Sequence, residues 1–182
     1  MTSDMTSDKT FGKTAVRPEL SELGITQAHL ALCRSPECKD ATQLVDAGKD
    51  MFDRPQQLTA ATLRNWQAMQ SAASADGISL LLVSGYRSFD YQCELIRSKL
   101  AQGKLIEDIL RVNAIPGYSE HHTGCALDLH DGIGEPLSTE FETRAAFAWL
   151  AEHAAEYAFA LSYPRDNEYG MDYEPWHWRC LG

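Results

Sequence analysis

The chain has 182 residues and a formal net charge of −10, from 16 basic and 26 acidic side chains; 44% of its residues are hydrophobic and 23% are charged. This is ordinary globular composition in a length that buries a core without disulfide bonds. The acidic balance argues against a nucleic-acid binder, which normally carries a basic patch, and against simple adhesion to anionic lipid.

The first residues, "MTSDMTSDKTFGKT", lack the apolar region of a secretory signal, and no stretch approaches the ~18 consecutive apolar residues of a membrane-spanning helix. We expect residues 1–17 to form a disordered tail and residues 18–182 to form one monomeric domain. The five cysteines are an odd, scattered set that does not indicate a disulfide framework. Cys33 and Cys38 could close a small loop in an oxidising compartment, but reduced and partly buried thiols are the simpler interpretation.

The first half of the domain is predicted to be mainly helical. After one or two helical turns in "PELSELGITQAHLAL", residues 59–75 carry apolar side chains at helical spacing behind the N-cap candidate Thr59. The apolar run "ISLLLVSG" predicts a short buried strand, because it is brief and ends in glycine. The segments "SFDYQCELIRSKLAQG" and "KLIEDILRVN" predict two more helices, and Ser88 or Asp90 caps the first.

Strands are predicted mainly in the last third of the chain. In "CALDLH" the alternation places Asp128 and His130 on one strand face, and "YAFALSY" alternates as a half-buried strand. Between them, "TEFETRAAFAWLAEHAAE" predicts one helix with Thr139 and Glu142 as a capping box. Pro175 cannot donate to a central ladder, so the ending "YEPWHWRCLG" is predicted to be an edge strand or a turn. Without a βαβ rhythm, the fold class is α+β, with helices packed on one small antiparallel sheet.

The stretch "GYSEHHTGCALDLH" concentrates imidazole and acid in a way that suggests a metal site. Catalytic zinc needs about three protein ligands of N, O or S type and one open position. His121 and Asp128 flank Gly124, which lets the chain turn back between a loop and the following strand. His177 is the best third ligand, because Glu174 lies three residues before it and could take a proton from a zinc-bound water.

Three motifs together resemble the VanY-type zinc D-alanyl-D-alanine carboxypeptidases. They are "SGYRSFDYQ", "SEHHTGCALD" and "YEPWH", in the family's order, and the resemblance covers roughly residues 57–182. The resemblance implies the fold that this family shares with VanX dipeptidases and the hedgehog signalling domain. The combination of the three motifs is specific, although no single one of them would be.

The resemblance implies a role for each matching residue. One zinc ion would be bound by three side chains: His121, Asp128 and His177. Glu174 would be the general base and later the proton donor to the leaving amine, and Arg87 would polarise the scissile carbonyl or hold a substrate carboxylate. Three further residues lie where relatives line the substrate pocket: Gln92, which would help to bind the terminal D-alanine, Ser119 and Tyr163.

The chain departs from the family pattern at three positions. His122 stands where relatives often have glutamine, so two adjacent histidines compete as the ligand, and the motif spacing favours His121. Ser162 stands where an arginine or another larger residue is expected. Cys125 lies inside the motif, and strand alternation directs its side chain away from Asp128. None of these changes removes a ligand or the base.

Several residues near the motifs are interpreted without a function. Glu120 and His130 are predicted to be solvated side chains, although ligand-orienting partners exist in many metal sites and His130 could be one. Arg179 is assigned no chemistry and could pair with an acid nearby. Trp66 and Trp149 are predicted to lie in the core.

The sequence therefore predicts a zinc metallocarboxypeptidase that removes the C-terminal D-alanine from peptidoglycan stem peptides. An L,D-carboxypeptidase or a peptidoglycan endopeptidase is the nearest alternative, and a non-catalytic zinc-binding module is the alternative from another class. The compartment stays open between the periplasm or cell wall, if a signal has been removed, and the cytoplasm.

Overall fold

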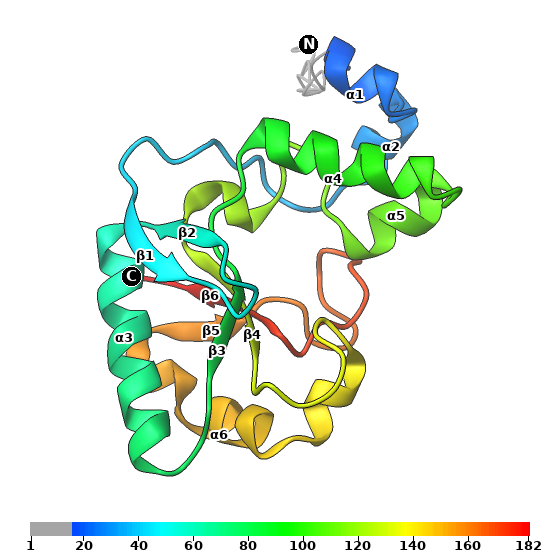
Figure 1. Cartoon of the computed structure of the whole chain (residues 1–182). Coiled ribbons are helices and arrows are strands. Elements are labelled where there is room, and N and C mark those ends of the chain that lie inside the picture. Colours follow the sequence, from blue (N-terminus) through cyan, green and yellow to red (C-terminus); the bar gives the residue numbers. More distant parts are fainter. Residues whose placement is uncertain (1–15) are drawn as a thin grey trace, which may run out of the picture.

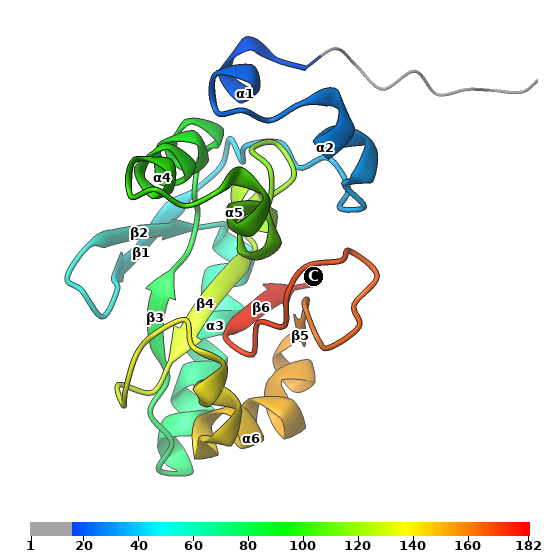
Figure 2. The same ribbon diagram turned by 90° about the vertical axis from the view of Figure 1, so that its right-hand side faces the viewer.

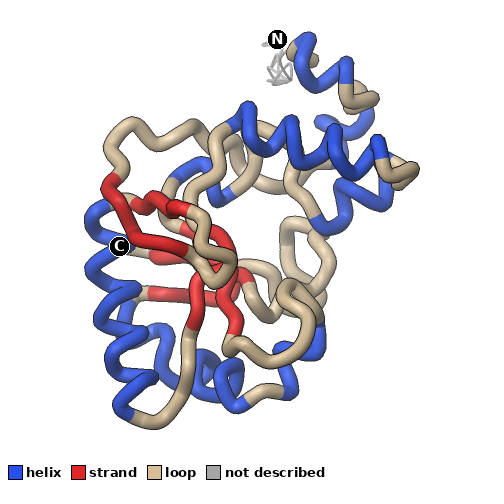
Figure 3. Tube along the Cα trace, viewed as in Figure 1, coloured by secondary structure: helices blue, strands red, loops and turns tan. Residues whose placement is uncertain are grey.

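The computed structural model describes residues 16–182, and the prediction of a disordered tail falls, for residues 1–15, outside this range (Figure 1). The predicted α+β class is confirmed. The main sheet is antiparallel throughout, in the order β3-β4-β6-β5. Its strands are β3 (Leu81–Ser84), β4 (Ala126–His130), β5 (Phe159–Leu161) and β6 (His177–Cys180). Figure 3 shows the strands gathered in the middle of the molecule with helices around them.

Helices cover the sheet and extend beyond it in two groups. α3 (Ala60–Ala75) and α6 (Ala145–His153) pack on the sheet, while a second group stands above it (Figure 1). The second group contains α1 (Pro18–Glu22), α2 (Gln27–Leu32), α4 (Phe89–Ala101) and α5 (Ile106–Val112). Each group has its own apolar core. The first core includes Trp66 and Trp149, as predicted, at 3% and 8% exposure.

The predicted caps of the two long helices are present. The Thr59 side chain accepts a hydrogen bond from Thr62 N at the start of α3, and the Ser88 side chain accepts one from Tyr91 N at the start of α4. Each bond satisfies a backbone donor that has no partner within the first helical turn. The sequence prediction and the structure agree on both starts, because capping is a local interaction.

A two-stranded hairpin was not predicted. It consists of β1 (Val45–Lys49) and β2 (Pro55–Leu58), and its strands are mostly exposed and polar. In Figure 2 the hairpin lies on the β3 side of the sheet, away from β5. Met51 N donates to Leu82 O within β3, and Tyr86 N, two residues after β3, donates to Gln57 O, so the hairpin is joined to this segment at two points. It forms one wall of the cleft described below.

The prediction of a single helix for residues 139–156 is wrong. The segment forms the 3₁₀ turn η2 (Thr139–Thr143), then α6, then a second 3₁₀ turn, η3 (Ala154–Tyr157). The chain is extended at Arg144, with ψ at 150°. Glu142 does not close a capping box, because its carboxylate accepts two hydrogen bonds from Arg165, at 2.8 and 2.9 Å. A distant ion pair therefore replaces the local interaction that the spacing suggested.

The C-terminal strand was also placed wrongly. β6 is a central strand between β4 and β5, and not an edge strand or turn. Pro175 does not interrupt the ladder, because it lies two residues before the strand begins. Cys38 is not in a disulfide bond, so the loop that a Cys33–Cys38 bond would close is not formed. No helix among residues 16–182 is long and apolar enough to cross a membrane.

Candidate metal centre

Three strands and a 3₁₀ turn meet at one end of the sheet. Ser84 of β3 lies opposite Asp128 of β4, and Asp128 lies opposite His177 of β6. The 3₁₀ turn η1 (Glu120–Thr123) brings His121 beside them. Gly124 joins η1 to β4 at φ +68°, and a Cβ there would stand 2.7 Å from a Leu44 side-chain carbon. The predicted turn at Gly124 is therefore present, and its left-handed conformation favours glycine.

His121, Asp128 and His177 form one buried cluster. Each is at most 3% exposed, and their candidate ligand atoms all lie within 4.8 Å of one another. His121 Nε2 is 3.3 Å from Asp128 Oδ2, and His177 Nδ1 is 3.1 Å from Asp128 Oδ1. The three predicted metal ligands are thus brought together from a turn and two neighbouring strands.

The His121 ring is arranged as a metal ligand. Its Nδ1 donates to Gly85 O at 2.6 Å, so Nε2 carries a lone pair. Nε2 is buried and has no hydrogen-bond partner among the described residues, although it faces the Asp128 carboxylate. Burial lowers the pKa of His121 to about 4, with a contribution from Arg87. A neutral imidazole that directs a lone pair at a carboxylate fits a bound cation between them.

His177 lies between two carboxylates. Its Nδ1 faces Asp128, and its Nε2 is 2.9 Å from Glu120 Oε2. Burial lowers its pKa, but the hydrogen bonds to Asp128 and Glu120 outweigh that effect and raise the pKa to about 10. The ring is therefore protonated on both nitrogens without a metal. The donor set fits zinc, because an ion can replace the Nδ1 proton while Nε2–H stays bonded to Glu120.

His122, the adjacent histidine, takes no part in the cluster. Its Nδ1 donates to Arg87 O at 2.6 Å, and its Nε2 accepts a hydrogen bond from Gly117 N at 3.0 Å. Both ring nitrogens thus serve backbone groups. Of the two adjacent histidines, only His121 faces Asp128 and His177.

Glu120 is the residue near the ligands that the sequence interpretation missed. It was predicted to be solvated, but it is 5% exposed. Ser162 Oγ donates to its Oε2 at 2.6 Å, and Arg179 Nη1 donates to its Oε1 at 3.1 Å. Burial raises the pKa of Glu120, but His177, Ser162 and Arg179 together lower it to about 2. Its position next to a ligand in "SEHH" was the only signal that could have identified it.

The prediction for His130 was wrong in the same way. This residue is 2% exposed, its Nδ1 accepts a hydrogen bond from Gly132 N at 3.0 Å, and its ring stacks on Phe141 with centroids 6.0 Å apart. These contacts belong to the first apolar core. They give His130 a packing role rather than a position beside the ligand cluster.

Glu174 stands on the open side of the cluster. The chain turns between it and His177, whose backbone N–H donates to Glu174 O at 3.1 Å. Glu174 Oε2 is 3.8 Å from His177 Nδ1, and within residues 16–182 no group donates a hydrogen bond to its carboxylate. Burial, opposed in part by the charge of His177, raises the pKa of Glu174 to about 7. This carboxyl is thus able to gain or lose a proton near neutral pH.

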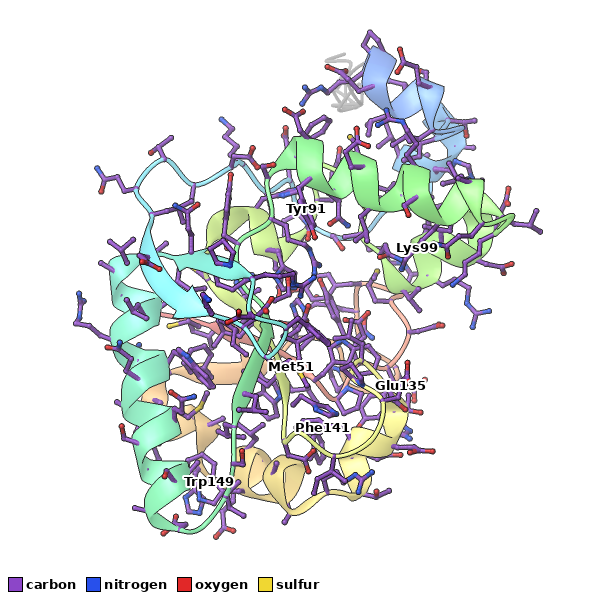
Figure 4. The ribbon with its side chains drawn as sticks, viewed as in Figure 1. Met51, Tyr91, Lys99, Glu135, Phe141 and Trp149 are labelled. Carbon is purple, nitrogen blue, oxygen red and sulfur yellow. The ribbon has the colours of Figure 1, made fainter. Side chains whose placement is uncertain are left out.

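Arg87 joins the cluster to the cleft. Its Nη1 donates to Asp128 Oδ2 and to Ser84 Oγ, each at 3.1 Å, and its Nε is buried with no partner in the described chain. Arg87, Asp128 and Glu174 all line a cavity of about 520 Å³. Figure 4 shows Tyr91 and Lys99 projecting from α4 and Met51 at the tip of the hairpin, on the two sides of this region. The chemistry-bearing residues therefore face an accessible cleft.

The three predicted pocket residues are all buried. Gln92 is fully buried and donates to Ala114 O at 2.9 Å, while its Oε1 has no partner within residues 16–182. The Tyr163 ring lies 4.6 Å from the His177 ring, and burial raises the pKa of its hydroxyl well above the usual range. Ser119 is 2% exposed. None of the three is on the surface of the 520 Å³ cavity, so their role in binding stays a prediction.

Comparison with known proteins identifies a family. The VanY family model, described as D-alanyl-D-alanine carboxypeptidase, matches residues 55–182. A D-alanyl-D-alanine carboxypeptidase of Enterococcus faecium is 33% identical over 139 residues, which cover 74% of this chain and 41% of that protein. The chain spans less than half the length of this and two other curated relatives that it matches.

Solved structures of similar proteins share the fold. LdcB, an LD-carboxypeptidase whose structure concerns peptidoglycan recognition, has a TM-score of 0.70 at 30% identity, over 81% of this chain and 72% of its own. A mutant of the VanY D,D-pentapeptidase from a VanB-type vancomycin resistance cassette, in complex with Zn(II), has a TM-score of 0.60 at 28% identity. That match covers 79% of this chain and 80% of the VanY chain.

Proposed function

The chain belongs to the VanY family of D-alanyl-D-alanine carboxypeptidases, as its motifs predict, and on this premise we propose that it is a zinc-dependent carboxypeptidase that removes the C-terminal D-alanine from peptidoglycan stem peptides. The observation that carries the proposal is the buried cluster of His121, Asp128 and His177 at the end of a cleft that also contains Glu174. A structural zinc site is usually closed by four protein ligands, whereas three ligands leave a position open.

One zinc ion would be bound by His121 Nε2, a carboxylate oxygen of Asp128 and His177 Nδ1. Two imidazoles and a carboxylate are an ordinary ligand set for catalytic zinc. The unpaired Nε2 of His121 supports this assignment, and so does the Zn(II) bound to the VanY relative. When bound, zinc lowers the pKa of a water molecule and polarises the scissile carbonyl.

Glu174 is the proposed general base. Its carboxylate takes a proton from the water that attacks the scissile carbonyl and afterwards returns it to the departing amine of D-alanine. A single carboxyl performs both transfers best when its pKa lies near the working pH. The pKa of about 7 in the metal-free protein supports this role, as does the lack of hydrogen bonds to the Glu174 carboxylate from the described chain.

Arg87 is proposed to stabilise negative charge on the substrate. The Nε of Arg87 has no hydrogen-bond partner in the described chain. The guanidinium is planar, so its N–H donors point in fixed directions. The hydrogen bonds to Ser84 and Asp128 hold that group in place beside the ligand cluster. A donor fixed in advance stabilises an oxyanion without a cost of reorganisation.

Glu120 is proposed as a positioning residue that acts through His177. Its ionised carboxylate accepts a hydrogen bond from Nε2–H, so the tautomer of His177 leaves Nδ1 free for a metal. Ser162 and Arg179 hold Glu120 in turn. Ser162, which departs from the family pattern, thus supplies a hydroxyl that can donate a hydrogen bond to the Glu120 carboxylate.

A second candidate function is the L,D-carboxypeptidase reaction on tetrapeptide stems. It is favoured by the likeness to LdcB, which has a higher TM-score than the VanY structure with Zn(II). A non-catalytic zinc module is disfavoured, because neither Glu174 nor Arg87 would be needed to hold a structural ion. The residues that distinguish a D- from an L-configured neighbour of the scissile bond would be among those that line the cleft.

Mass spectrometry of products from a mixture of pentapeptide and tetrapeptide muropeptides tests the proposal. Zinc-loaded protein should remove one alanine from the pentapeptide; removal from the tetrapeptide would support the L,D reaction, and cleavage higher in the stem an endopeptidase. The Glu174→Ala protein should keep zinc and lose turnover, whereas His177→Ala should lose both. No turnover of any stem by zinc-loaded protein would overturn the proposal in favour of the non-catalytic module.

A further inference from the structure

The cleft contains a cation that forms no ion pair with a carboxylate of the described chain. Three cations line the cleft: Arg54, Arg87 and Lys99. Arg54 Nε donates to Asp50 Oδ2 at 2.7 Å, and Arg87 Nη1 donates to Asp128 Oδ2 at 3.1 Å. The hydrogen bond of Lys99 Nζ within residues 16–182 is to a neutral acceptor, the Asn113 amide oxygen at 3.0 Å. Lys99 therefore has donor capacity left over, because an ammonium group carries three N–H groups.

Lys99 is held in the wall of the cleft. A lysine in the last turn of a helix often serves only the helix dipole and extends into water. The Lys99 side chain is instead half-buried and crosses from α4 to Asn113, the C-cap residue of α5. Asn113 is 7% exposed, and its Nδ2 donates to Ile109 O at 2.9 Å, which directs its Oδ1 at Lys99. The ammonium group is thus positioned by a side chain that is itself fixed.

The electrostatic surroundings of Lys99 favour an anion. Burial lowers the pKa of Lys99, and the positive charges of Lys104 and Arg87 lower it further, while Glu174 acts in the opposite direction. Removing a cation partly from water has a cost that a bound anion offsets. Every substrate of a carboxypeptidase carries such an anion, the terminal carboxylate, and peptidoglycan stems also carry acidic groups before the scissile bond.

We propose that Lys99 binds a carboxylate of the peptide substrate and so makes an acidic group on the substrate a condition of tight binding. The proposal rests on the proposed function for the identity of the peptide, but it concerns binding rather than turnover. Two sources of the carboxylate are distinguished by the test below: the C-terminus of the peptide and an acidic group earlier in the stem.

Calorimetric binding to zinc-loaded Glu174→Ala protein measures the effect without turnover. The ligand is a synthetic stem pentapeptide that ends in D-alanyl-D-alanine with a free acid. Adding Lys99→Met should weaken binding about 10- to 100-fold, the range expected for a charge-assisted hydrogen bond. The matched control is Lys104→Met, which removes the same charge from an exposed neighbour and should change binding less than about twofold because exposed charges are screened.

Two modified peptides identify the source of the carboxylate. If Lys99 binds the C-terminus, a C-terminal amide should bind both proteins equally weakly. If Lys99 binds an earlier acidic group, the C-terminal amide should still bind more weakly to the protein with Lys99→Met. A stem with its earlier acidic groups amidated should then bind equally to the proteins with and without this substitution. Equal binding of all three peptides to the proteins with and without Lys99→Met would overturn the proposal, as would a failure of the free acid to bind either protein. Binding that depends on Lys99, together with no turnover of the same peptide by zinc-loaded protein that keeps Glu174, would instead overturn only the proposed function.

Discussion

His177 has a buried glutamate beside each of its ring nitrogens, and the two glutamates differ in what surrounds them. Glu120 and Glu174 are 5% and 6% exposed, yet the pKa of Glu120 is lowered to about 2 and that of Glu174 is raised to about 7. Glu120 accepts hydrogen bonds from Ser162 and Arg179 as well as from His177. Glu174 accepts none from residues 16–182 and has His177 Nδ1 at 3.8 Å.

The comparison separates the effect of burial from the effect of donors. Burial alone raises the pKa of a carboxyl, and only hydrogen bonds and opposite charges reverse this. Glu120 therefore stays ionised and can orient a histidine at any physiological pH. Glu174 can exchange a proton near neutrality, as a general base must. Beside His177, glutamate thus occurs once as an ionised, hydrogen-bonded partner and once as a carboxyl that can gain or lose a proton near neutral pH.

The largest expected effect is that of removing the reactive carboxylate. Glu174→Gln should lower kcat/KM for stem-peptide hydrolysis by about 10²- to 10⁴-fold, the usual contribution of general acid–base catalysis. Zinc content, measured by atomic absorption, should stay at one ion per chain, because Glu174 is not among the three ligands. Loss of zinc together with activity would mean that Glu174 helps to bind the metal, and the proposed difference in role between Glu174 and Glu120 would be wrong.

Removing the charge of the other glutamate should act on the metal instead. Glu120→Gln should weaken zinc binding by about 10- to 100-fold, the range seen when a partner of a ligating histidine is lost. Competition with a chelator measures the affinity directly. Activity should recover largely when zinc is added to saturation, and this recovery distinguishes a positioning residue from a catalytic one. Unchanged zinc affinity would contradict the role assigned to Glu120.

The same two substitutions should change the stability of the metal-free protein in opposite directions. The folded-state pKa of Glu174 lies above its unfolded value of 4.5, so its ionisation destabilises the fold as the pH rises from 4.5 through about 7. The pKa of Glu120 lies below its unfolded value, so its stabilisation is present above pH 4.5 and is lost as the pH falls towards 2.

Denaturant unfolding at pH 8 provides the measurement. Glu174→Gln should raise the free energy of unfolding and Glu120→Gln should lower it, each by about 1–3 kcal/mol. At pH 4 the gain from Glu174→Gln should disappear, because the wild-type carboxyl is then neutral. If both variants changed the free energy of unfolding at pH 8 in the same direction, the difference in hydrogen-bond donors would not explain the pKa values of the two carboxyl groups.

The turns that carry the proposed ligands and the proposed base could be predicted from the sequence because their geometry is local. His121 and Asp128 are separated by one turn that needs Gly124, and Glu174 and His177 lie on another turn. The helix starts at Thr59 and Ser88 were predictable for the same reason. In each case a few neighbouring residues determine the conformation.

What could not be predicted depends on residues that are distant in the chain. The partners of Glu120 come from positions 162 and 179, and neither a lone serine nor a lone arginine marks such a contact. The helix predicted for residues 139–156 is broken where Glu142 pairs with Arg165. The β1–β2 hairpin has exposed, polar strands, so no hydrophobic alternation marked it.

The smallest effect on zinc affinity is expected from removing one of the hydrogen bonds that hold Glu120. Ser162→Ala removes one neutral donor, at 2.6 Å from Glu120 Oε2, while His177 and Arg179 stay in place. A hydrogen bond to a charged group contributes about 1.5–3 kcal/mol, and only a small part of that reaches the metal through His177, so zinc affinity should fall about two- to fivefold. Ser138→Ala is the control, because its hydroxyl accepts a hydrogen bond from Glu140 N in the turn η2, and it should leave zinc affinity unchanged. If Ser162→Ala lowered zinc affinity as much as Glu120→Gln, the Ser162 hydroxyl, rather than the charge of Glu120, would be the group that orients His177 for metal binding.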